Sequence, residues 1–486
     1  MQIGIFICFV LYTLVLFLVM WLSSRKADNE TYFVGNRKSP WFVVAYGMIG
    51  ASLSGVTLLS VTGDVHTTQF TYFGIVMGYV LGYAVIALVL LPLYYKLNLT
   101  SIYTYLEQRF GTASYKTGAF FFVLSRLLGS AIRMYLVIYV LQEFVFRHWN
   151  IPIWVTACVF VIIILFYTFR GGIKTVVWTD LLQTTFLLGA LVFSIIFIPK
   201  EMNLSLSGMF HEMQLDGLTK VFNTHWRDHN FFVKQILSGA FITITMTGLD
   251  QDMMQKNLSC KNLKDAQRNM FTFSGILVFV NAMFLLLGGI LIVFASHNGI
   301  DIASMKTDRI FPTIAFEYMP PIMGVFFVLG LISAGYSSAD GTLTSLTTVV
   351  CVDFLGLKKS NKSQKEQIRI RRKIHILMGT LFLAVILIFT RFHNDALIRI
   401  IFQIASYTYG PLLGLYSFGM FTKREIPAKQ ERFVPLFAFL SPLICLFVNS
   451  YSKELLFGYQ FGFELLLLNG LIMMFFLWIL SKKRGV

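Results

Sequence analysis

Apolar runs of about 20 residues follow one another along the whole chain. A helix of ~20 apolar residues crosses the ~30 Å hydrocarbon core of a bilayer, and helices satisfy their own backbone groups there. The pattern therefore predicts an all-α, polytopic membrane protein with about 13 transmembrane helices. The predicted spans are 3–22, 41–62, 70–95, 117–145, 151–169, 175–198, 231–250, 270–296, 321–351, 374–391, 396–421, 433–450 and 460–481.

The composition agrees with this pattern. The chain of 486 residues is 56% hydrophobic and only 13% charged, with a mean hydropathy of +0.70. The first run, 3–22, lacks the basic start and small-residue cleavage site of a signal peptide, so we interpret it as a retained helix. The five cysteines are scattered, which predicts neither a disulfide framework nor a metal cluster.

The positive charge of the chain is distributed unevenly between alternate loops. With the N-terminus outside, 28 of the 40 Lys and Arg residues fall in inner segments and eight in outer ones. This asymmetry predicts a multi-pass protein of the plasma (inner) membrane with a cytoplasmic C-terminus. The basic segment 355–373 is predicted to be a solvated cytoplasmic loop beside anionic membrane lipid. A nucleic-acid partner is not expected, although the net charge is +16.

The ninth span carries an unusual concentration of polar residues, between 331 and 348. If this segment is helical, five of them form one stripe: Ser333, Ser337, Asp340, Thr344 and Thr347. An ionisable group at membrane depth costs roughly 2.5–3.5 kcal/mol on insertion scales, so it should face a partner, an ion or water. The stripe therefore predicts a polar site inside the bundle.

Two other spans contain residues that can interrupt a helix. Glycines and small hydroxyl residues alternate at 47–57 in the second span and at 239–248 in the seventh. Such residues can free backbone carbonyls where a helix lines a cavity, or they can allow close helix packing. We favour a break in the second span and leave both alternatives open for the seventh. Gly50 and Ser337 are both expected near the middle of the bilayer.

The order of the spans permits an inverted repeat. Spans 2–6 and 7–11 are consecutive sets of five, and an odd number per set inverts the second set in the membrane, as in many secondary transporters. The predicted divisions are 1–40 (first helix and inner loop), 41–198 (first five-helix repeat), 199–230 (extracellular loop), 231–421 (second repeat) and 422–486 (two C-terminal helices and tail).

Hydroxyls and backbone carbonyls without many carboxylates suit a monovalent hard cation, and Na⁺ is the natural candidate. Asp180 and Asp340 are both predicted in the inner half, where they can form an exit route or a second cation site. For Asp180 the alternative is an interfacial acid at a helix N-terminus. Arg133 can pair with a buried carboxylate or bind an anionic substrate.

The end of the seventh span and the rest of the chain add three further expectations. Asp250 and Asp252 are interpreted as interfacial, capping or gating residues. Phosphate-binding, dinucleotide-binding and hydrolase motifs are not found, so an enzyme is not predicted. The five residues that follow the last span, which end at Val486, do not suggest the output domain of a sensor.

An ordered set of motifs resembles the sodium/solute symporter family, whose members carry sugars, sialic acids, amino acids, vitamins and small anions with Na⁺. The motifs are YFVGNRKSPWF, GASLSGVT, LTSIYTYLEQRFG, YTFRGGIKTVVWTDLLQ, GLDQDMMQKNLSCKNLKDAQ and AGYSSADGTLTSLTTVVCVDF. The resemblance implies an inverted five-helix repeat core of the leucine-transporter type, often with thirteen spans and an outer N-terminus.

The resemblance also implies particular cation ligands. The family's main sodium site matches the carbonyls of Gly50, Leu53 and Ala334 and the side chains of Ser337 and Ser338. Some members bind a second Na⁺ with the aspartate that matches Asp180 and with hydroxyls just beyond the main pair. Those positions here are Asp340 and Gly341. The added carboxylate is expected either to support a second cation or to replace it by a protonatable group.

The solute is indicated less directly. Sialic-acid members present hydroxyls at the positions of Ser52, Ser54 and Thr57 and an arginine on span 4, matched here by Arg133. Galactose-type members differ from this chain at Thr57 and near Met246. We therefore predict Na⁺-coupled symport of a small polar solute by alternating access, with a sugar or sugar acid such as sialic acid favoured. The alternatives are Na⁺- or H⁺-coupled uptake of an amino acid or monocarboxylate, and a transporter-like sensor.

Overall fold

The computed structural model describes residues 2–24, 28–391 and 397–483, and this part of the chain is helical and contains no strand. The α-helices are α1 (Gln2–Ser23), α2 (Asn29–Val34), α3 (Trp41–Ser52), α4 (Thr62–Thr68), α5 (Phe73–Val85), α6 (Leu91–Lys96), α7 (Thr104–Arg109), α8 (Thr112–Leu141), α9 (Ile153–Thr168), α10 (Ile173–Glu201), α11 (Leu206–Leu215), α12 (Phe232–Thr243), α13 (Gln251–Leu258), α14 (Leu263–His297), α15 (Thr307–Thr313), α16 (Pro321–Val349), α17 (Gln364–Phe389), α18 (Leu397–Phe421), α19 (Ala428–Glu431), α20 (Val434–Ser450), α21 (Ser452–Leu455) and α22 (Leu465–Leu480). Short π-helical or 3₁₀ segments are η1 (Gly35–Arg37), η2 (Thr57–Val61), η3 (Gln69–Tyr72), η4 (Ile86–Leu90), η5 (Gln142–Phe146), η6 (Arg147–Trp149), η7 (Ile244–Gly248), η8 (Ile314–Tyr318), η9 (Val350–Phe354) and η10 (Leu357–Lys359).

The predicted all-α class is confirmed, and each predicted span coincides with a helix or a broken helix. By length and hydropathy, seven segments of the described chain can cross a membrane, or eight if one bent pair counts as a span. Four further apolar helices, α3, α9, α20 and α22, are shorter than this criterion requires. The chain is therefore a multi-pass membrane protein, and the number thirteen stays a prediction.

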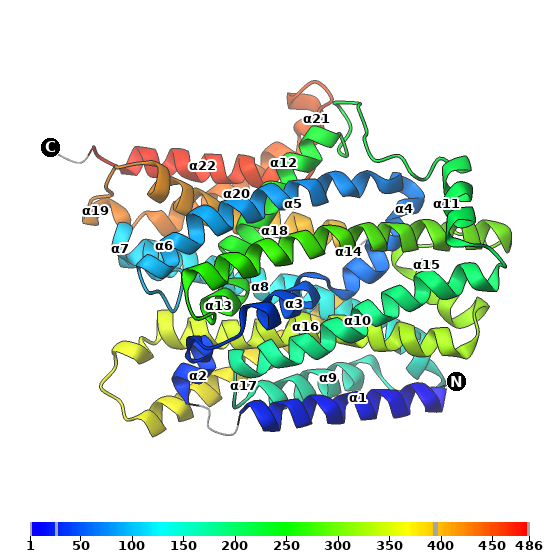
Figure 1. The fold of residues 1–486 in the computed structure, drawn as a ribbon. Coiled ribbons are helices and arrows are strands. Elements are labelled where there is room, and N and C mark those ends of the chain that lie inside the picture. The colour runs from blue at the N-terminus through cyan, green and yellow to red at the C-terminus, as the bar shows by residue number, and fades with distance from the viewer. Residues whose placement is uncertain (1, 25–27, 392–396, 484–486) are drawn as a thin grey trace.

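The long helices run along a common direction in Figure 1. α1 begins at the right of that view, whereas α22 ends at the left. The short elements α2, α7 and α19, which belong to predicted inner segments, also lie at the left. α11 and α15, from predicted outer segments, lie at the right. The two predicted sets of loops thus occupy opposite ends of the bundle.

α16 lies at the centre of this bundle and packs against α3, α8 and α10. Every residue of α16 from Gly330 to Val349 is buried. A helix that is buried on all sides belongs to the core of a large protein. The polar stripe of the ninth span therefore faces protein, as its sequence predicts.

The second span is broken, as predicted. α3 ends at Ser52, and Leu53 takes an extended conformation (φ −89°, ψ 110°) before the helix resumes at Gly55 and continues as η2. The new turn begins with the N–H of Thr57 donating to the carbonyl of Ser54 at 2.9 Å. The irregular segment between the two helices lies inside the protein, where backbone groups can find partners other than lipid.

The seventh span is broken too, and the residues after it form a buried helix. The helix continues through Gly248, then bends by 65° at Leu249–Asp250 and proceeds as α13. All eight residues of α13 are buried. Asp250 caps α13 by accepting hydrogen bonds from the N–H groups of Asp252 (2.9 Å) and Met253 (3.2 Å). Capping is thus confirmed for Asp250, and both aspartates are buried within the protein.

The basic segment 355–373 also differs from its prediction. Only its first half is a loop, because α17 begins at Gln364, where Ser363 and Glu366 form a capping box. Arg371 is 2% exposed, and its guanidinium lies 4.2 Å from the centre of the Tyr32 ring. A cation over an aromatic face is stabilised even when it is removed from water, which a hydropathy average does not detect.

Candidate functional site

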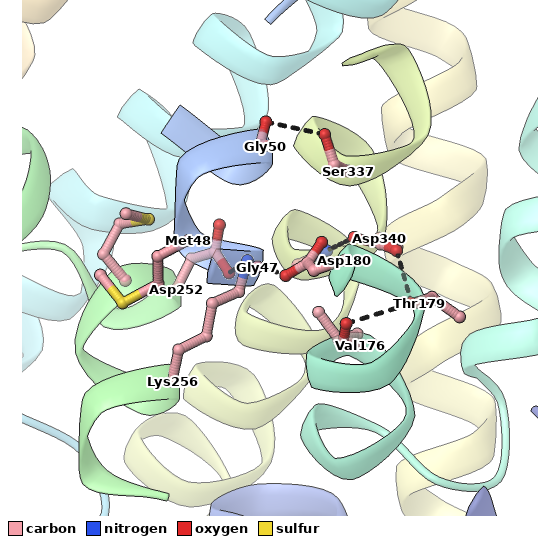
Figure 2. Close-up of polar contacts among 12 residues, drawn as sticks. Gly47, Met48, Gly50, Val176, Thr179, Asp180, Asp252, Lys256, Ser337 and Asp340 are labelled. Atoms are coloured by element: carbon pink, nitrogen blue, oxygen red, sulfur yellow. Dashed lines mark hydrogen bonds and ion pairs between the residues drawn. The ribbon is translucent and has the colours of Figure 1, made fainter. Parts of the chain in front are cut away.

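The predicted sodium ligands of α3 and α16 lie together at the break of the second span. The hydroxyl of Ser337 lies 2.9 Å from the carbonyl oxygen of Gly50 and 3.3 Å from that of Ala334 (Figure 2). Residues 287 positions apart in sequence thus share a hydrogen bond. The contact unites a carbonyl at the broken helix with a hydroxyl on the central helix.

The remaining predicted ligands lie on the same two elements. Leu53 directly follows the last residue of α3, and it is buried, as is Ala334. The side-chain oxygen of Ser338 is buried and has no hydrogen-bond partner in the described part of the chain. Since buried hydroxyls are normally paired, this oxygen is free to contact a bound species. An oxygen-rich donor set of this kind fits Na⁺.

Gly50 also allows α3 and α10 to approach closely. Its N–H donates to the hydroxyl of Thr184 on α10 at 3.1 Å. A Cβ atom at Gly50 would lie only 3.2 Å from the Cα of Thr184, which is backbone and cannot move cheaply. The glycine therefore sets the position of the carbonyl that contacts Ser337.

Replacement of Gly50 by alanine tests this packing. We expect Gly50→Ala to separate α3 from α10 and to raise the Na⁺ concentration for half-maximal stabilisation of the purified protein about tenfold, corresponding to ~1.4 kcal/mol. Gly189→Ala on α10 is the matched control, because a Cβ there meets nothing within 4 Å. Equal Na⁺ dependence in both variants would contradict the proposed role of Gly50.

Asp340 lies one turn further along α16 and is held by neutral donors. Its Oδ2 accepts hydrogen bonds from Tyr167 (3.0 Å), Thr179 (3.3 Å) and Gln183 (3.3 Å). Its Oδ1 lies 2.6 Å from the backbone nitrogen of Gly341. The carboxylate is fully buried, so these bonds replace water without supplying a positive charge.

Asp180 is buried, and it lies beyond the first turn of α10, which begins at Ile173. Its Oδ2 lies 2.8 Å from the Nζ of Lys256, and each side chain is only 1% exposed. Figure 2 shows Lys256 reaching from α13 toward Asp180, with Asp340 beside it. The other carboxylate oxygen of Asp180, Oδ1, has no hydrogen-bond partner among the described residues.

Arg126, not Arg133, forms the buried ion pair of α8. Its guanidinium contacts Asp252 and lies 3.6 Å from Asp250. Asp250 also accepts a hydrogen bond from Tyr409 at 2.6 Å. The intramembrane position of Arg126 in the sequence already indicated a partner, but its aspartates were assigned to the membrane surface.

The predicted solute-binding residues line one cavity. This cavity, of about 100 Å³, lies between the broken second span, α5, α8 and the seventh span. Ser52, Ser54, Thr57 and Arg133 all contribute to its wall. Arg133 makes no hydrogen bond or ion pair within the described ranges. Met246, near which galactose-type members differ from this chain, also lines the cavity. Further lining residues, which the sequence did not single out, include Tyr72, Tyr79, Tyr83, Arg126 and Asn281.

Comparison with known proteins bears on this arrangement. The chain is 25% identical over 413 residues to the sodium/sialic acid symporter SiaT of Proteus mirabilis, covering 83% of this chain and 82% of that protein. It is 23% identical over 412 residues to the sodium/sialic acid symporter NanT of Aliivibrio fischeri, covering 83% and 80%. A substrate-bound, outward-open structure of a Na⁺-coupled sialic acid symporter aligns with 99% of each chain, at a TM-score of 0.81 and 21% identity.

The structural alignment shows that the two proteins share one fold, over almost the entire length of both chains. The family model of the sodium:solute symporters matches residues 32–426, which include both broken spans, α16 and the cavity. Members of this family are secondary transporters that use Na⁺ as the coupling ion, and they are not enzymes. On this evidence the chain belongs to the sodium:solute symporter family.

Proposed function

We propose that this symporter takes up a small, hydroxyl-bearing organic anion, with a sugar acid such as sialic acid as the favoured class. The observation that carries the proposal is the guanidinium of Arg133, which has no partner among the described residues and lies in the same cavity as the hydroxyls of Ser52, Ser54 and Thr57. A guanidinium binds a carboxylate through two parallel hydrogen bonds, and the hydroxyls can bond to polar groups of a sugar. The names of the relatives support the same class.

We further propose the assignment of the cation sites. The main Na⁺ site consists of Gly50, Leu53, Ala334, Ser337 and Ser338, and a second site lies at Asp180 and Asp340. The unpaired hydroxyl of Ser338 and the unpaired Oδ1 of Asp180 support this assignment. A sodium ion at the main site would link the end of α3 to α16. Binding of Na⁺ and binding of solute then strengthen each other by the same factor.

The placement in the membrane is also a proposal. The N-terminus lies outside and the C-terminus in the cytoplasm of the plasma (inner) membrane. The excess of Lys and Arg in the inner segments and the opposite positions of the ends of α1 and α22 support this orientation. The two five-helix repeats at 41–198 and 231–421 would then be inverted relative to each other.

Uptake into proteoliposomes tests the function. Purified protein is reconstituted, and N-acetylneuraminate accumulation is measured with an inward Na⁺ gradient, an inward H⁺ gradient or neither. We expect accumulation with the Na⁺ gradient alone, because each Na⁺ entering down 100 mV contributes about 2.3 kcal/mol beyond its concentration gradient. Accumulation driven by H⁺ alone would favour the proton-coupled alternative. A thermal-shift screen of amino acids and monocarboxylates with and without Na⁺ covers the other solutes.

Removal of the cavity guanidinium should affect the solute rather than Na⁺. We expect Arg133→Met to raise the solute concentration for half-maximal uptake by at least tenfold, since a charge-assisted hydrogen bond is worth ~1.5–3 kcal/mol. Stabilisation of the solute-free protein by Na⁺ should be unchanged. Arg147→Met is the control, because Arg147 is 71% exposed and pairs with Glu143. Unaltered solute dependence in Arg133→Met would remove Arg133 from the site.

Asp340 distinguishes this chain from the hydroxyl pattern of its family, and Asp340→Asn tests its role. The substitution keeps the size of the side chain but removes a buried negative charge beside Asp180. We expect either fewer Na⁺ ions per solute or a loss of pH dependence. Reversal potentials in proteoliposomes measure the first quantity, and uptake between pH 5.5 and 8.5 measures the second. If Asp340→Asn and the original protein have the same reversal potential and the same pH dependence of uptake, Asp340 has no role in coupling.

A further inference from the structure

Lys256 holds an unusual position between two buried carboxylates. Its Nζ lies 2.8 Å from Oδ2 of Asp180 and 3.7 Å from Oδ1 of Asp252. All three side chains are at most 1% exposed. The Nζ atom makes no contact with hydrogen-bond geometry in the part of the chain that the structure describes. The ammonium is closest to Asp180, and a second carboxylate, that of Asp252, lies within 4 Å of the same atom.

The two carboxylates belong to different parts of the site. Asp180 lies beside Asp340 and below the contact between Gly50 and Ser337 (Figure 2). A Cβ at Gly47 would lie only 2.9 Å from the Cβ of Asp180, so this aspartate packs directly against α3, the helix that carries Gly50. We call the group formed by Asp180, Asp340 and the contact between Gly50 and Ser337 the cation region. Asp180, at one end of the ion pair with Lys256, is thus part of this region.

Asp252 leads to the solute cavity instead. Its carboxylate contacts Arg126, and Arg126 lines the cavity together with Arg133. Gly341 on α16 makes room for this arrangement, because a Cβ there would lie 2.9 Å from the Cγ of Asp252. A continuous row of charged contacts therefore joins the cation region to the cavity, in the order Asp180, Lys256, Asp252, Arg126.

The charges in this region do not balance. Among the described residues of this region, four carboxylates are buried, those of Asp180, Asp250, Asp252 and Asp340. The described cations that form ion pairs with them are Arg126 and Lys256. With all four carboxylates ionised, the negative charges in these ion pairs exceed the positive ones by two. Uncompensated charge inside a protein is strongly unfavourable, so the region attracts a further cation. Any such cation at Asp180 competes with the ammonium of Lys256.

We propose that Lys256 is a positioning residue that transmits cation binding to the solute cavity. When Na⁺ binds at Asp180, the ammonium moves toward Asp252 and competes there with Arg126. Asp252 then neutralises less of the positive charge of Arg126. Because Arg126 lines the cavity, the cavity becomes more positive and attracts an anion more strongly. This inference rests on the proposed second cation site and on the proposed anionic solute. It adds the connection between them, which neither proposal contains.

A purely structural ion pair predicts a different response to substitution. If Lys256 only neutralises Asp180, its removal leaves an unpaired carboxylate, but the charge of the distant cavity remains insensitive to Na⁺ in every variant. If Lys256 transmits binding, its removal has two opposite effects. The cation binds more tightly because its competitor is gone, and the cavity no longer responds to that binding.

The first measurement is Na⁺ affinity without solute. Thermal stabilisation of the purified full chain is followed during Na⁺ titration, with choline maintaining the ionic strength. We expect Lys256→Met to lower the half-saturating Na⁺ concentration about tenfold and Lys256→Arg, which keeps the charge, to remain near the original value. Lys261→Met is the matched control, since Lys261 is exposed and lies just after α13. A higher half-saturating concentration in Lys256→Met would overturn the competition.

The second measurement is the charge of the cavity. In a Thr57→Cys background, with Cys8 and Cys158 replaced by serine, the rates of an anionic and a neutral methanethiosulfonate reagent are compared in Na⁺ and in choline. We expect Na⁺ to raise the ratio of anionic to neutral rates about fivefold when Lys256 is present. With Lys256→Met the ratio should not change with Na⁺. The same rise in both proteins would overturn the proposal.

Asp252→Asn provides a second variant if Lys256→Met does not fold. It removes the carboxylate that Lys256 and Arg126 share, so the ratio should be high in choline and rise no further in Na⁺. A remaining Na⁺-dependent rise would overturn the connection through Asp252. If the protein with native Lys256 is not stabilised by Na⁺ at all, the proposed cation sites fail. If it is stabilised and Lys256→Met behaves identically in both measurements, only the transmission through Lys256 fails.

Discussion

Arg126→Met is expected to abolish transport and to lower the free energy of unfolding by about 3–5 kcal/mol, the usual cost of breaking a buried ion pair on one side. Arg126 compensates Asp250 and Asp252, and these three side chains are nearly inaccessible to water. Without the guanidinium, two adjacent carboxylates remain in a region that already contains Asp180. The bend between η7 and α13 depends on Asp250 as its cap, so the seventh span should lose its shape as well.

Thermal unfolding of the purified protein and uptake into proteoliposomes measure these two effects. Arg268→Met is the matched control, because Arg268 is 55% exposed and its pair with Asp265 spans 3.9 Å, so a change within about 0.5 kcal/mol is expected. The double substitution Arg126→Met with Asp252→Asn should recover part of the lost stability, since it removes one of the unpaired charges. An Arg126→Met protein as stable as the original would show that the buried pairs do not support the fold.

Ser337→Ala is expected to raise the Na⁺ concentration for half-maximal uptake by about 10- to 100-fold. The hydroxyl lies against the carbonyls of Gly50 and Ala334, and a hydrogen bond or ligand contact with a charged species is worth ~1.5–3 kcal/mol. Ser338→Ala should act in the same direction, because its buried oxygen has no protein partner within the described ranges. The maximal rate at saturating Na⁺ should change less than the half-saturating concentration.

Uptake measured against Na⁺ concentration, at fixed solute and membrane potential, tests both variants. Ser345→Ala is a suitable control, because Ser345 lies on the same helix but donates to the carbonyl of Thr342 at 3.0 Å. Its substitution should leave the Na⁺ dependence unchanged. If Ser337→Ala and Ser338→Ala both retain the original half-saturation, the main sodium site lies elsewhere.

The spans were predictable because the bilayer imposes a local rule. A segment of sufficient apolar length must be helical, and α1, α10 and α16 begin and end within a few residues of their predicted limits. The stripe on α16 was predictable for the same reason, since hydroxyls and a carboxylate at helical spacing cannot face lipid. The break after Ser52 followed from the glycines and small hydroxyl residues around it.

The charged residues near α13 were not predictable in this way. Gln251–Leu258 is polar on average, and a hydropathy average assigns such a run to water. Its burial depends on Arg126 from α8 and Asp180 from α10, which lie 126 and 76 positions away from their partners Asp252 and Lys256. Sequence spacing contains no information on whether these helices meet. For the same reason, the sequence singles out Arg133 and does not identify Arg126 as the partner of Asp250 and Asp252.

The sequence by itself determined the class of this protein, the approximate limits of its helices, the polar face of α16 and the elements that carry the candidate ligands. These features follow from interactions between near neighbours in the chain and from the energy of placing each segment in a bilayer. Only the tertiary structure decided which charges are paired, that Arg133 lines the cavity with no ion-pair partner in the described part of the chain, and that Lys256 lies between two carboxylates. Electrostatic energy depends on distance and burial, and both quantities arise only when separate helices pack together.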